Sequence, residues 1–140
     1  MKGELKRVYE AEMAAANAAL SRSVLDEAFA HLERAHVLGQ RYFFPHLDTH
    51  WRMLHIAQAR RDARETRGQV VRLAAVFVGY VTGWVPKGNT GGANVSATKP
   101  MLPPADLAPL LADYSVSRDV LARIGALALI SVAMIAWSAV

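Results

Sequence analysis

The chain contains no cysteine. This absence excludes disulfides, thiolate metal sites, iron–sulfur clusters and cysteine nucleophiles, and it leaves no redox marker of compartment. Charged residues are also few, at 20% of the 140 residues, whereas hydrophobic residues reach 53%. A chain of this length forms one domain with its own core. The side chains that remain for chemistry are mainly five histidines, which all lie between residues 31 and 55.

The net charge of +4 comes from 16 basic and 12 acidic residues, and most of the basic excess lies between residues 52 and 72. Such a segment could face the phosphates of nucleic acid or lipid. Asp62 and Glu65 interrupt it, however, and no aromatic residues are interleaved to stack on bases. A solvated helix face explains the charges better, so we expect no nucleic-acid binding.

The first 20 residues predict a helix and no secretory signal. Residues 1–7 carry charged side chains and lead into an alanine-rich segment instead of an apolar signal core. Residues 4–20 are good helix formers without proline or glycine. Residues 21–23 break this pattern, and Ser23 is expected to cap the next helix. These features favour a cytoplasmic location for this part of the chain.

Three further helical segments follow. The second helix is expected to stop at Gly39, and Pro45 suits the first turn of a third helix that continues through Glu65. Residues 69–86 are largely apolar but too short for a membrane span. We expect a buried core helix that ends near Gly83, with an interfacial helix as the alternative.

Residues 25–35 resemble the second helix of a tetratricopeptide repeat. In that repeat a small, a large and a second small residue let antiparallel helices interlock. The corresponding residues are Ala28, Leu32 and Ala35. A second copy, 40 residues on, has Arg72 in the place of the large residue, and the interval exceeds the usual one of about 34. The similarity supports antiparallel helical hairpins without a true repeat array.

A glycine-rich stretch, residues 86–96, separates the hairpins from the rest of the chain. No Lys-Ser/Thr pair follows its last glycine, so it does not form a Walker phosphate loop, and we expect an irregular loop. We therefore divide the chain into a helical hairpin domain over residues 4–86, a Gly/Pro-rich loop and linker over 87–112, and a hydrophobic helix over 113–140.

The hydrophobic helix is predicted to anchor the chain in a membrane. Residues 124–140 carry no charge, and Val120, Leu121 and Arg123 extend the segment toward the roughly 30 Å that a span requires. Apolar residues cover every face. Arg118 and Arg123 precede the span, which places the N-terminal domain in the cytoplasm, at the inner membrane of a bacterium. The alternative is a helix buried against the hairpins in a cytoplasmic protein.

Three of the histidines form the candidate site. His46 and His50 are spaced to point the same way from one helix, and His36 approaches them if the two helices form a hairpin. Glu33 and Met53 are possible additional ligands, each one helical turn away. Such a set suits zinc, copper or iron. The alternative is a group of packed histidines hydrogen-bonded to backbone or to a nearby carboxylate.

The remaining histidines, His31 and His55, are expected on the surface. A zinc-protease motif needs a Glu after the first histidine of the pair, but Leu47 follows His46, so a metalloprotease is not predicted. Spacing assembles no Ser-His-Asp arrangement either. Enzyme activity is thus uncertain, and the sequence favours a protein without it.

Several motifs together resemble a small bacterial family, the domain of unknown function 3703. They are residues 35–40, His46 and His50 with residues 51–54, and the glycine-rich stretch continuing through residues 100–101. The resemblance covers about residues 4–112 and implies no activity, because the family is uncharacterised. Its pattern includes positions matching His36, His46 and His50, which favours the metal hypothesis.

The sequence therefore predicts an all-α protein of antiparallel helical hairpins with a glycine-rich loop and a C-terminal hydrophobic helix. Its expected role is that of a non-enzymatic adaptor or accessory subunit, held at a membrane and associated with a membrane protein complex. The alternative is a transition-metal-binding protein that uses His36, His46 and His50 in metal handling or redox chemistry.

Overall fold

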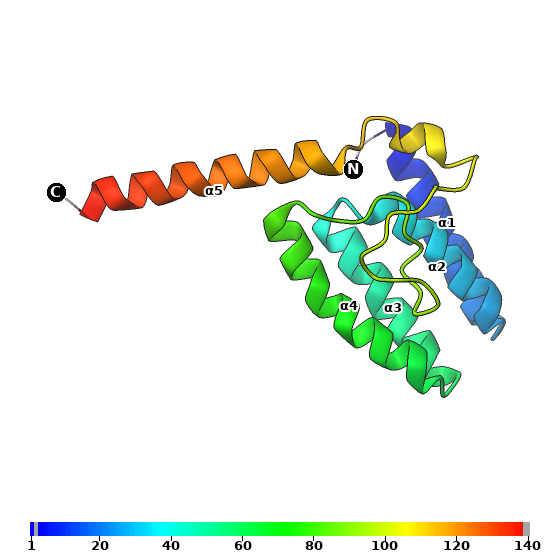
Figure 1. Cartoon of the computed structure of the whole chain (residues 1–140). Coiled ribbons are helices and arrows are strands. Elements are labelled where there is room, and N and C mark those ends of the chain that lie inside the picture. Colours follow the sequence, from blue (N-terminus) through cyan, green and yellow to red (C-terminus); the bar gives the residue numbers. More distant parts are fainter. Residues whose placement is uncertain (2, 139–140) are drawn as a thin grey trace.

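The computed structural model describes residues 1 and 3–138. Helices α1 (Gly3–Ser21), α2 (Leu25–Gly39), α3 (Phe43–Ala59) and α4 (Ala63–Thr82) pack side by side as antiparallel hairpins (Figure 1). A short 3-10 helix, η1 (Ala108–Leu111), precedes α5 (Val116–Ser138), which projects away from the hairpins. The described residues contain no strand, so the predicted all-α class is confirmed.

The main hydrophobic core lies between α1, α2 and α3. Its buried members are Ala16, Ala19, Ala28, Leu32, Met53 and Ile56. Alanines at these positions let the helix backbones approach closely while Leu32 fills the space between them. The small, large and small residues that resemble a tetratricopeptide helix, Ala28, Leu32 and Ala35, are all fully buried.

Two helix starts differ from the sequence prediction. Ser23 does not cap α2: it adopts a positive φ of 60°, and Val24 occupies the N-cap position without a side-chain bond. The third helix does not continue through Glu65, because Arg61 also has a positive φ (56°) and Asp62 starts a new helix. The Asp62 carboxylate accepts a hydrogen bond from the Glu65 backbone N–H at 2.9 Å, which satisfies one free donor of the new helix.

The helix α4 ends at Thr82 and is capped by Gly83 in the left-handed conformation, as predicted. The expectation of a buried apolar helix is wrong, because its burial pattern is inverted. The buried residues include Glu65, Gln69 and Arg72. Of its apolar side chains Val76 is buried, but five others are exposed, namely Val70, Val71, Phe77, Val78 and Val81.

The loop after α4 explains this inversion. Residues 83–107 are irregular, as predicted, and the glycine-rich part packs against the polar face of α4. Arg72 donates hydrogen bonds to the carbonyls of Gly92 (2.8 Å) and Val95 (2.7 Å). Gly68 permits the close approach, since a Cβ there would lie 2.5 Å from the Cβ of Ala93. Polar residues of α4 are therefore buried because they bind loop backbone.

The root of α5 is held to the hairpins by specific contacts. Arg41 forms two hydrogen bonds with the Asp119 carboxylate, both at 2.7 Å, and the Arg123 guanidinium lies 4.5 Å from the Tyr80 ring centre. None of the α5 residues is buried. The alternative prediction, a helix buried against the hairpins of the same chain, is therefore not observed. Among the described residues, this is the one helix that is long and apolar enough to cross a membrane. With 23 residues it spans about 34 Å.

Candidate metal centre

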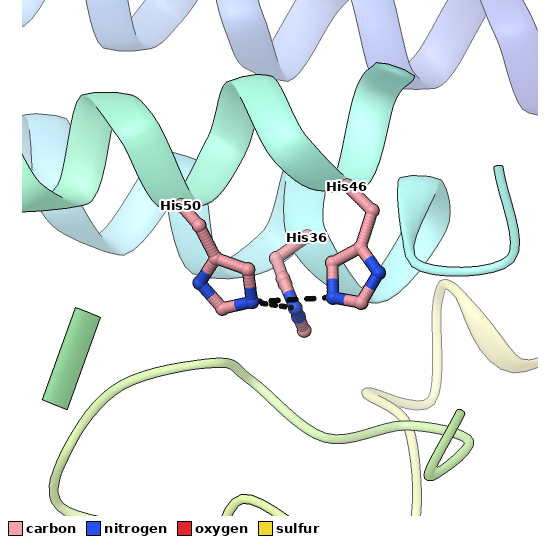
Figure 2. Close-up of side chains that lie close together, drawn as sticks. All are labelled: His36, His46 and His50. Atoms are coloured by element: carbon pink, nitrogen blue, oxygen red, sulfur yellow. Dashed lines mark hydrogen bonds between the residues drawn. The ribbon is translucent and has the colours of Figure 1, made fainter. Parts of the chain in front are cut away.

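Three histidine side chains from two helices converge on one point. His36 comes from the last turn of α2, whereas His46 and His50 come from successive turns of α3 (Figure 2). The Nε2 atom of His50 lies 3.1 Å from Nε2 of His36 and 3.1 Å from Nε2 of His46. The candidate ligand atoms of the cluster all lie within 4.8 Å of one another. Three nitrogens around a tetrahedral zinc ion would be about 3.3 Å apart, which is close to the two Nε2–Nε2 distances of 3.1 Å.

Hydrogen bonds on the outer side of two rings determine their tautomers. The Nδ1 atom of His36 lies 2.8 Å from the backbone carbonyl oxygen of Asn89, which can only accept. The Nδ1 atom of His50 lies 2.7 Å from Oε1 of Gln69. Both Nδ1 atoms must therefore carry the proton, and in the neutral rings both Nε2 lone pairs face the cluster. Metal-ligating histidines commonly have this outer hydrogen bond.

The side chain of Gln69 has one possible orientation. Its amide nitrogen donates to the Glu65 carboxylate at 2.6 Å and to the carbonyl of Gly91 at 2.9 Å. Its amide oxygen must then face His50. Gln69 thus links α4, the loop and α3, and it fixes the ring of His50.

Burial keeps these rings neutral. Burial lowers the pKa of His46 to about 3 and that of His50 to about 4, and it also lowers the pKa of His36 well below its ordinary value. The positive charge of Arg72 adds to the effect at His36 and His50. An imidazolium in this cluster is therefore disfavoured at neutral pH.

Neutral rings cannot satisfy both short Nε2–Nε2 contacts. A proton on Nε2 of His46 can be donated to His50, but the lone pairs of His36 and His50 then still face each other at 3.1 Å. A proton on Nε2 of His50 could be donated to His36 or His46. That ring would then carry a proton on both nitrogens, because its Nδ1 already donates to Gln69, and it would be positively charged. A metal ion satisfies all three nitrogens while each ring stays neutral.

A cavity of about 300 Å³ lies against the three histidines. Its walls come from α4, from the segment after Gly83 and from the loop, and they are mostly apolar. Apolar lining residues include Ala75, Val76, Val78, Trp84, Val85 and Ala97. Ala75 and Val78 are exposed, so the cavity opens at the surface along α4. Arg72 is the charged side chain in its wall.

The other predicted ligands lie outside the cluster. Met53 is buried in the hydrophobic core, where its sulfur lies 3.6 Å from the Gln69 amide nitrogen. Glu33 lies beside Gly92 of the loop, and its pKa is raised by burial. His31 pairs with Glu12 at 2.7 Å and is partly exposed, and His55 is exposed, as expected for surface residues.

The sequence does not predict the polar residues that surround the histidines. The sequence predicts Arg72 in a solvated basic segment and as a misfit in the tetratricopeptide pattern, yet it is buried. It predicts Gln69 at the start of an apolar segment and Asn89 in an irregular loop, with no role at the site for either. One signal was available: Glu65, Gln69 and Arg72 are spaced by four and three residues, which places them on one helix face.

Comparison with known proteins gives one match. A family model described as "Protein of unknown function (DUF3703)" matches residues 3–111, and so covers the hairpins, the histidine cluster and the loop. No curated protein and no solved structure matches the chain.

Proposed function

Since the chain belongs to the DUF3703 family, whose function is unknown, we propose from the geometry of the site that it is a transition-metal-binding protein. The ligands are His36, His46 and His50. One observation carries this proposal: the Nε2 lone pairs of His36 and His50 face each other at 3.1 Å in a buried place, while their Nδ1 atoms donate to other residues.

The chemistry of the ligands restricts the metal. Three imidazole nitrogens without thiolate favour zinc, copper or iron over calcium and magnesium, which prefer oxygen ligands. The orienting residues support the proposal further, because Asn89 and Gln69 hold two of the three rings with their nitrogens inward.

The test is elemental analysis of the purified full-length chain and of single His→Ala variants. We expect about one ion per chain, either copurified or taken up from zinc, copper or iron salts. Replacing His36, His46 or His50 should abolish it. His31→Ala and His55→Ala are the matched controls, since these histidines lie outside the cluster, and they should retain the ion. No ion in the unmodified protein after reloading would refute the metal site.

We also propose that α5 holds this domain at a membrane, with the hairpins in the cytoplasm. The support is an apolar helix of 23 residues without a buried side chain. Aromatic side chains that suit a membrane interface lie at its root: Phe44, Phe77 and Tyr80 are exposed and line one surface pocket together with Asp119 and Arg123 of α5. In this setting the chain would act as an accessory subunit or adaptor for a membrane protein complex.

Replacing Ile130 with Arg tests the anchor in the full chain. A charge near the middle of the span costs about 3 kcal/mol on insertion, so the variant should shift from the membrane to the soluble fraction. Ser117→Arg, at the start of α5 beside Arg118, is the control and should remain membrane-bound. Equal membrane retention of Ile130→Arg would contradict a spanning helix.

A further inference from the structure

The proposed ion would be held by the three histidines alone, so the cavity beside them is not explained by metal binding. Three protein ligands leave a fourth coordination position open, whereas structural zinc sites are closed by four. Here the histidines themselves line the cavity, so the open position of a bound ion would face it. Its volume of about 300 Å³ is far more than the roughly 30 Å³ that one water occupies.

The charges around the cavity favour an anion as the fourth ligand. The three histidines are neutral ligands, so a divalent ion keeps its full charge. Arg72 adds a further positive charge in the same wall. No carboxylate lies among the residues that line the cavity in the described part of the chain. The nearest acid on α4, Glu65, is engaged with Gln69 and with the backbone N–H of Ala93.

The walls of the cavity favour an apolar body for the same ligand. Beyond the histidines and Arg72, most of the wall is formed by side chains such as Val76, Val85 and Ala97. Apolar walls with a few polar groups at one end are typical of sites for small organic molecules. The polar and the apolar parts of the wall thus suit different parts of one molecule.

We propose that the metal site, which rests on the function proposed above, binds a small organic anion whose carboxylate takes the open coordination position. The apolar part of this anion lies between α4 and the loop. No bond is formed or broken in the ligand, and the carboxylate displaces water from the ion.

The experiment uses the full chain in a non-ionic detergent, loaded with cobalt(II), whose visible spectrum reports its ligands. Acetate, butyrate and hexanoate are titrated in turn. We expect saturable spectral shifts, with affinity that rises about fourfold for each added methylene because each is buried in the cavity. Bound cobalt is quantified separately by elemental analysis.

Two variants test the cavity itself. Ala75→Phe fills it from the α4 side, and Thr98→Phe fills it from the loop side, so a folding defect in one does not decide the result. Both should retain cobalt but lose the dependence on chain length. Ala74→Phe is the matched control, because Ala74 is exposed on α4 and does not line the cavity.

The outcomes separate the two proposals. Stoichiometric cobalt whose spectrum does not respond to carboxylates, or responds equally to acetate and hexanoate, would overturn the ligand proposal and leave the metal site standing. An absence of bound cobalt, zinc, copper and iron would overturn both.

Discussion

The two helical hairpins use their interiors differently. Between α1 and α2 the buried side chains are apolar, with Ala16, Ala19, Ala28 and Leu32 at the centre. In the second hairpin α4 buries Glu65, Gln69 and Arg72, while Phe77 and all of its valines except Val76 face outward. The first hairpin follows the usual rule for a stable core. The second departs from that rule where α4 binds the loop, and this is where the histidines are oriented. The comparison distinguishes an apolar half of the domain, α1 and α2, which forms most of the main core, from a polar half, α4 and the loop, which orients the histidines even though His36 itself lies on α2.

The largest effect is expected from damage to the apolar half. Leu32→Ala removes a fully buried side chain between three helices and should lower the free energy of unfolding by about 2–5 kcal/mol. Metal content per folded molecule should stay unchanged, because Leu32 touches no ligand-orienting bond. Leu102→Ala, at a side chain 96% exposed, is the control for a leucine without packing. A loss of metal from folded Leu32→Ala protein would show that the halves are not separate.

Acidification should act on the polar half. The pKa of His46 is about 3 and that of His50 about 4 in the folded chain, against about 6.5 when unfolded. The unfolded state therefore binds more protons below pH 6.5. In metal-free protein the stability is fully present above this pH and falls as the pH decreases toward 4. Each of the two histidines contributes about 1 kcal/mol per pH unit.

Denaturant titrations of metal-free protein at pH 7, 6 and 5 measure this slope. His46→Asn should make it shallower, whereas His55→Asn, at an exposed ring, should leave it unchanged. A stability that is constant from pH 7 to 5 would contradict neutral buried rings.

A smaller effect is expected from Gln69, which links α4 and the loop to His50 of α3. Gln69→Leu removes the acceptor for Nδ1 of His50 and should weaken metal binding about 10- to 100-fold. Competition with a chelator of known affinity measures this change. Gln58→Leu on the exposed side of α3 is the control. Equal affinities in the two variants would mean that the ring of His50 needs no support.

The smallest effect on folding is expected from the outward face of α4. Val71→Ser changes a side chain that is 63% exposed and should alter the free energy of unfolding by less than about 0.5 kcal/mol. Val76→Ser, five residues away and 1% exposed, should cost clearly more. Similar costs for the two would show that the outward valines are buried by another molecule.

Much of the fold could be predicted, because helix propensity and apolar spacing are local signals. The segments over α1 and α2, proline in the first turn of α3 and the stop at Gly83 followed from such signals. The break at Arg61 was missed, since a positive φ at arginine has no marker in sequence. Ser23 was misassigned as a cap for the same reason.

The candidate site could be predicted only in part. The spacing of His46 and His50 and the reversal of the chain at residues 40–42 place His36, His46 and His50 together, and this follows from helix geometry alone. Their role as ligands stays a prediction. The polar residues around the histidines could not be predicted, because the contacts of Gln69 and Arg72 depend on a loop more than 15 residues further along the chain. A buried arginine bound to backbone carbonyls and a solvated one are identical in sequence.

The ion pair at the root of α5 has a mechanical consequence. Arg41 lies midway between His36 and His46 in the chain, and both of its hydrogen bonds to Asp119 tie this connector to the first turn of α5. A helix of about 34 Å acts as a long lever on so short a link. Tilting α5 relative to the hairpins would strain this pair and the connector that carries Arg41. If α5 spans a bilayer as proposed, its tilt would therefore bear on the segment that joins His36 to His46.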